Sequence, residues 1–157
     1  MFPRILRFIR LPLLLILLFA IGRFSLGLAG VPYAPRGNAM FSIVGLTFIS
    51  SFYWGALSGR VGGFSWLGAA LIGIALGLFA QILIFGATAL SYALDLKTSY
   101  FLHWDALNVP EGTVVPMSRA LVTRAGGLLI NPIMCGIIAV IGRALGFLAP
   151  GRQHSDY

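Results

Sequence analysis

No charged side chain occurs between Arg60 and Asp95, and the stretch from Trp66 to Leu94 is almost entirely apolar. About 20 apolar residues in a helix are enough to cross the hydrocarbon layer of a bilayer, which is about 30 Å thick. In a small soluble domain a helix keeps one polar face towards water, so a run of this kind is not expected there. The stretch therefore predicts a transmembrane helix over residues 66–94.

The composition also indicates a chain whose solvent is lipid. Hydrophobic residues make up 59% of the 157 residues and charged residues only 10%, whereas soluble domains contain about 25% charged residues. Because the other apolar stretches also have helical lengths, we expect an all-α fold that forms one transmembrane domain over residues 1–157. The four expected spans cover residues 11–31, 39–57, 66–94 and 118–149.

The longest polar segment, residues 95–117, separates the third and fourth predicted spans. It carries Tyr100 and Trp104, and the pair Tyr53 and Trp54 lies near the end of the second span. Aromatic rings with a polar atom favour the headgroup level of a bilayer. We therefore expect these four residues to be interfacial anchors and the segment to be an interfacial loop.

The N-terminal segment allows two interpretations. Arg4, Arg7 and Arg10 precede an apolar run, and Arg23 interrupts it. A basic start followed by a short apolar core is also typical of a secretory signal peptide, which would remove residues 1–29. Because the apolar character continues beyond Arg23, a retained first helix is favoured, and the signal peptide remains the alternative.

The charge balance predicts the orientation of the chain. It carries 11 Lys and Arg against 4 Asp and Glu, for a net charge of +7. Basic residues are enriched on the cytoplasmic side of membrane proteins, so the N-terminal arginines place both termini in the cytoplasm. The bases are scattered over the ends of the spans, which favours contact with lipid headgroups and not with nucleic acid. Arg23 and Arg143, just inside span ends, are expected to snorkel, with binding of an anionic lipid headgroup as the alternative.

Few side chains could perform catalysis inside the membrane. All four acidic residues and both histidines lie outside the predicted spans, so neither an intramembrane haem nor a membrane-embedded proton carrier is expected. The best metal candidates are His103, Asp105 and Glu111, since imidazole and carboxylate groups suit zinc or manganese. An ordinary solvated loop is the favoured alternative. We expect no enzyme activity and no cofactor.

Small residues recur every four positions along three predicted spans. They form a stripe on one face of each helix, and small residues let membrane helices approach closely. The stripe is either a face for other subunits or for a second copy of the chain, or the internal packing of one bundle. Its members are Gly55, Gly59, Ala69, Gly73, Gly77, Gln81, Gly142 and Gly146, and Cys135 is expected to be a packed small residue.

These patterns predict a small non-catalytic membrane protein. We expect an accessory or scaffolding subunit that packs against a larger membrane complex, or against itself, through its small-residue helix faces. One alternative is a small oligomeric channel or transporter in which Gln81, Thr88 and Asn131 line the path. A third is a membrane enzyme that uses the loop over residues 95–117.

Overall fold

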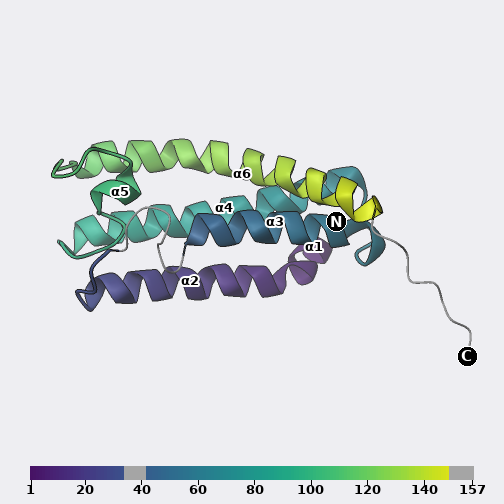
Figure 1. The fold of residues 1–157 in the computed structure, drawn as a ribbon, viewed down its shortest axis with the longest axis horizontal. Helices are drawn as coiled ribbons and strands as arrows, with labels where there is room; N and C mark the ends of the chain where they lie inside the picture. The colour runs from purple at the N-terminus through teal and green to yellow at the C-terminus, as the bar shows by residue number, and fades with distance from the viewer. Residues whose placement is uncertain (34–41, 149–157) are drawn as a thin grey trace, which may run out of the picture.

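The computed structural model describes residues 1–33 and 42–148, and in these ranges the chain is all-α. Four long helices lie alongside one another, with α1 at one end of the bundle and α5 at the other (Figure 1). We call these the α1 end and the α5 end. The helices are α1 (Phe2–Phe8), α2 (Arg10–Leu28), α3 (Ile43–Arg60), α4 (Trp66–Ala93), α5 (Trp104–Leu107) and α6 (Met117–Leu148).

Three of these helices, α2, α4 and α6, are long and apolar enough to cross a membrane. The prediction of an all-α chain with membrane-spanning helices is therefore confirmed at this level. The second predicted span, residues 39–57, corresponds in part to α3, which is not among the three. Residues 39–41 of that span lie outside the described residues, as does residue 149 of the last one.

The polar face of α3 explains its lower hydropathy. Thr47, Ser50, Ser51 and Ser58 of this helix are all buried inside the bundle. The hydroxyl of Thr47 donates to its own helix, to the carbonyl of Ile43 at 2.6 Å. The hydroxyl of Ser58 donates to the carbonyl of Gly55, three residues earlier in the helix, at 2.6 Å. Thr47 and Ser58 thus satisfy their hydroxyl hydrogen bonds within their own helix, and α3 turns its polar side towards the other helices.

The first predicted span, residues 11–31, is part of a helix pair broken at Ile9, where φ is −97° and ψ is 12°. Pro12 causes the break, because it has no N–H to donate to the carbonyl of Phe8. That carbonyl instead accepts the indole N–H of Trp54 on α3, at 3.1 Å. The second helix of the pair, α2, ends at Leu28, three residues before the predicted end.

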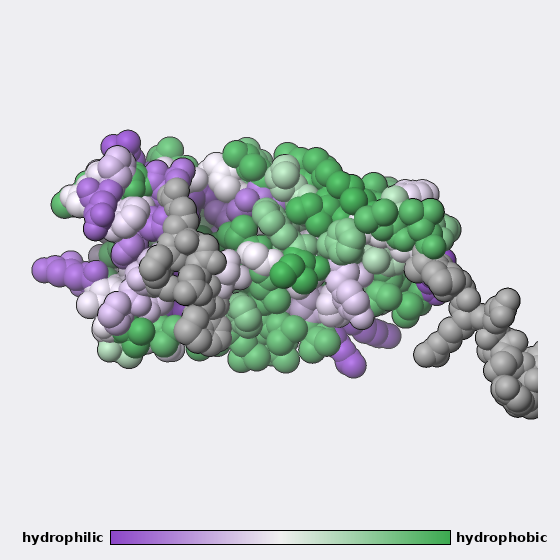
Figure 2. Space-filling model, in the orientation of Figure 1, coloured by the Kyte–Doolittle hydropathy of each residue, from purple (hydrophilic) through white to green (hydrophobic). Residues whose placement is uncertain are grey.

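The hydrophobic core joins the N-terminal helices to the rest of the bundle. Ile5, Ile9 and Ile16 are fully buried and pack in one cluster with Ile72 and Leu76 of α4. The N-terminal segment therefore contributes core side chains. Outside, the middle of the face in Figure 2 is hydrophobic, and hydrophilic residues gather at the α5 end.

Candidate functional site

The small-residue stripes lie inside the bundle, between helices of the same chain. Gly73 on α4 faces the backbone of Cys135 on α6, and Gly55 on α3 faces Ala139 on α6. A Cβ at Gly77 would lie 2.8 Å from Cα of Pro132. Ala69 and Cys135 are fully buried.

The other glycines of the stripes lie between α3 and α6. Gly142 and Gly146 face Phe52 and Ala56 of α3, and Gly59 faces the side chain of Arg143. These residues thus pack α3, α4 and α6 together.

Gln81 is 3% exposed and ties α4 to α6 with its amide group. Its Nε2 donates to the carbonyl of Arg124 at 3.0 Å, and its Oε1 accepts from Nδ2 of Asn131 at 2.6 Å. Thr88 donates to the carbonyl of Ile84 in its own helix at 2.8 Å. The three side chains predicted to line a conduction path therefore bond to groups of the protein.

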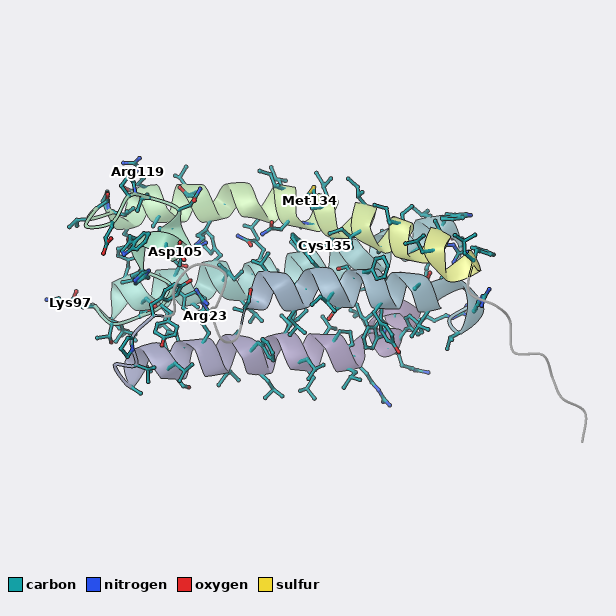
Figure 3. All side chains as sticks on the ribbon, viewed as in Figure 1. Arg23, Lys97, Asp105, Arg119, Met134 and Cys135 are labelled. Atoms are coloured by element: carbon teal, nitrogen blue, oxygen red, sulfur yellow. The ribbon has the colours of Figure 1, made fainter. Side chains whose placement is uncertain are left out.

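An aromatic cluster surrounds Arg23 near the α5 end, where Figure 3 labels it. The guanidinium donates to the hydroxyl of Tyr33 at 2.8 Å and lies 5.0 to 5.8 Å from the ring centres of Tyr33, Tyr100 and Phe101. These cation–π distances are short enough for attraction. The imidazole of His103 stacks on Tyr33 with 4.1 Å between ring centres. Arg23 is only 9% exposed and points into the protein.

The three metal candidates do not converge on one point. Nδ1 of His103 accepts the backbone N–H of Asp105 at 3.2 Å and so caps α5, while Glu111 is exposed. Within residues 1–33 and 42–148, no three His, Cys, Asp or Glu side chains come together in a way that could hold a metal ion. The structure therefore gives His103 a local role as a helix cap and a stacking partner.

His103 makes this loop sensitive to pH. Burial lowers the pKa of His103 below its ordinary value of 6.5. The negative charges of Asp105 and Glu111 raise this pKa, and the positive charge of Arg23 lowers it further. The folded loop therefore binds fewer protons than the unfolded one, so its stability rises with pH. We expect the contribution of His103 to be present above about pH 6.5 and to be lost as the pH falls below that. Hydrogen exchange of the amides of residues 103–107 at pH 7.5 and 5 measures the change.

The control for this experiment is His103→Asn, because asparagine also caps helices but does not titrate. Its loop opening, corrected for the intrinsic pH dependence of exchange, should be the same at both values. An equal pH dependence in the variant and in the native chain would show that another group is responsible.

The predicted aromatic anchors take different positions. Tyr53 is 52% exposed, whereas Trp54 is half-buried against the N-terminal helix break. Tyr100 is buried, and its hydroxyl donates to the carbonyl of Pro32 at 3.0 Å. Trp104 is half-buried beside His103. Two of the four thus use their polar atom inside the protein.

At the α1 end, arginines bind carbonyls and aromatic rings. Arg143 is 8% exposed, donates to Oγ of Ser58 at 3.2 Å and lies 4.9 Å from the ring centre of Trp66. Arg4 donates to the carbonyl of Gly62 at 2.6 Å. Arg4 thus binds the connection between α3 and α4, and Arg143 joins α6 to the last turn of α3 and to the first residue of α4.

An apolar groove of about 440 Å³ runs between α2 and α4. Its walls include small residues from both helices, among them Ala20, Ser25 and Ala87. Gly86 also lines it, and a Cβ built there would meet no atom within 4 Å. Gly86 thus differs from the glycines of the stripes, because the space beside it is open.

The sequence matches no protein-family model, no curated protein and no solved structure. The function is therefore inferred from the geometry of this chain. Two features carry that inference: an interior whose small and polar residues are used within the bundle, and an open apolar groove on its outside.

Proposed function

We propose that this chain is a small non-catalytic membrane protein that acts by packing against a transmembrane helix of another subunit. The helix would lie in the groove between α2 and α4, and this groove is the observation that carries the proposal. Membrane helices associate through close backbone approach at small residues. Ala20, Ser25, Gly86 and Ala87 supply such residues along the groove.

The interior supports association through this outer groove. The stripe glycines, such as Gly55 and Gly73, are already in contact with α6 of the same chain. These glycines already pack against helices of the same chain, so a partner has to approach a different surface of the bundle. Gly86, with open space beside it, is on α4 where a second helix could come close.

The proposal includes α3 as a fourth span. Its 18 residues extend about 27 Å at 1.5 Å per residue, close to the thickness of the hydrocarbon layer. Its polar residues are buried, and α3 packs against α4 and α6, while Ile49 is exposed on the other side. Lipid would thus meet the apolar side of α3.

The charges support an orientation for this bundle. The described basic residues at the α1 end are Arg4, Arg7, Arg10, Arg60 and Arg143, and those at the α5 end are Arg23, Lys97, Arg119 and Arg124. The difference is small, but the cluster Arg4, Arg7 and Arg10 precedes the first span, and the charges around the first helix usually dominate the orientation. The positive-inside rule then puts the α1 end in the cytoplasm. Residues 95–117 would lie at the opposite interface.

The polar contacts favour association over conduction. A water-filled path needs polar groups that face it, whereas Gln81 and Asn131 bond to each other across α4 and α6. Thr88 is fully buried and bonds to its own helix.

Site-specific photocrosslinking in native membranes tests the proposal. A photoreactive residue at Ile82, an exposed position in the groove, should give an adduct of defined protein mass. The same residue at Leu129, exposed on α6 outside the groove, should not. An adduct of twice the 16.8 kDa mass of the chain would identify the partner as a second copy.

Filling the groove provides the matched comparison. Gly86→Phe should abolish the adduct at Ile82. Gly126→Phe should preserve it, because Gly126 also has open space at its Cβ but lies on α6, away from the groove. Lipid adducts alone, or protein adducts that survive Gly86→Phe, would refute the proposal.

A further inference from the structure

A second cavity, of about 200 Å³, lies towards the α5 end among α2, α3, α4 and α6. Two arginines from distant parts of the chain line it, Arg23 on α2 and Arg124 on α6. The cavity forms where α3 begins at Ile43, further into the bundle than the neighbouring ends of α2 and α4 (Figure 1). It shares no lining residue with the α2–α4 groove.

Within residues 1–33 and 42–148, no acidic side chain forms an ion pair with either guanidinium group. The ion pair that the described residues do form joins Lys97 to Asp95, and both of these side chains are exposed at the surface. Nε of Arg124 is buried and has no hydrogen-bond partner among the described residues, and both guanidinium-bearing side chains line the same cavity. Arg23 is buried and Arg124 is half-buried, and like charges that are partly removed from water without a counter-charge destabilise a fold. The pair is therefore suited to a negatively charged ligand.

The donors around the cavity match a phosphate group. Each guanidinium offers parallel N–H groups that bind two oxygens of a phosphate at once. The hydroxyl of Tyr33 accepts from Arg23 and that of Ser42 accepts from the N–H of Gly45, so each can donate its own proton to a ligand oxygen. We propose that the cavity lined by Arg23 and Arg124 binds a phosphate-bearing anion, either a phospholipid headgroup or free phosphate.

The depth of the arginines is compatible with both sources. Arg23 lies five residues before the end of α2, and Arg124 lies seven residues after the start of α6. At 1.5 Å per residue these positions are about 7 to 11 Å from the helix ends. In a bilayer of about 40–45 Å including headgroups, this is the boundary between headgroups and acyl chains. A lipid phosphate lies at this level, and free phosphate would enter from the α5 end.

Thermal unfolding of the full chain in a neutral detergent tests the proposal. Phosphatidylglycerol, diacylglycerol, inorganic phosphate and chloride at matched ionic strength are added separately. The native chain should be stabilised by phosphatidylglycerol or by inorganic phosphate, but not by diacylglycerol or chloride. Arg124→Gln should weaken the response about tenfold in ligand concentration, because charged hydrogen bonds are lost. Arg119→Gln, an exposed arginine of the same helix, should respond like the native chain.

A second measurement remains informative whatever the variant does to folding. Without either anion, Arg124→Gln should unfold at a higher temperature than the native chain, because an unmatched and partly buried charge has been removed. With the anion bound, the native chain should unfold at a higher temperature than Arg124→Gln. Stabilisation by phosphatidylglycerol alone identifies a lipid ligand, and stabilisation by inorganic phosphate identifies a soluble one. No stabilisation by either anion, or equal responses of Arg124→Gln and Arg119→Gln, would overturn the proposal.

Discussion

Gly73→Leu is expected to prevent the bundle from forming. Gly73 lies directly against the backbone of Cys135 on α6, so even a Cβ has no room there. The neighbouring atoms are backbone, which cannot move aside as a side chain can, and overpacking of a well-packed interior costs about 1–3 kcal/mol or more. We expect Gly73→Ala to lower the free energy of unfolding by about 2 kcal/mol and Gly73→Leu to leave no monodisperse species in detergent size-exclusion chromatography.

Gly126→Leu is the control, because a Cβ at Gly126 meets no atom within 4 Å. This variant should elute and unfold like the native chain. If Gly73→Leu behaved in the same way, the contact between α4 and α6 would be wrong.

Gln81→Leu is expected to lower the free energy of unfolding by about 1–2 kcal/mol. The change removes the hydrogen bonds that Gln81 makes to Asn131 and to the carbonyl of Arg124. It leaves the amide of Asn131 without this partner in an apolar environment, which is the costly part. Unfolding in a denaturing detergent, followed by circular dichroism, measures the loss.

Gln81→Leu combined with Asn131→Leu separates the pair from its surroundings. The double variant should recover part of the stability, because no amide is then left without a partner. Additive losses in the two single variants would show that the side chains do not interact. A channel lined by Gln81 would instead show a change in solute flux with little change in stability.

Hydropathy was enough to place the two longest helices. The sequence predicts spans over residues 66–94 and 118–149, and the helices are Trp66–Ala93 and Met117–Leu148. Residues 66–94 carry no charge, and neither do residues 125–142 within the last span; apolar runs of this length are typical of membrane-spanning helices. The break at Ile9 could have been suspected from Pro12, but its partner Trp54 lies 46 positions away from Phe8, and no local pattern reveals that contact.

The candidate sites were harder to predict than the helices. The four-residue spacing of small residues identified a packing face but left its partner open, because internal and external packing use the same residues. Arg124 and Tyr33 were not singled out. Arg23 and Arg124 are about 100 positions apart in the sequence, so only the folded chain brings their charges together.

The inward polarity of α3 has a consequence for how the proposed bundle is made. In α3 on its own, Thr47, Ser50 and Ser51 would face lipid, because only the neighbouring helices cover them. Such a helix inserts poorly into a bilayer by itself. The connection to α4 is short, covering residues 61–65, so the strongly apolar α4 can carry α3 into the bilayer as a hairpin. In this arrangement, the topology of α3 is settled during biogenesis by the segment that is synthesised after it.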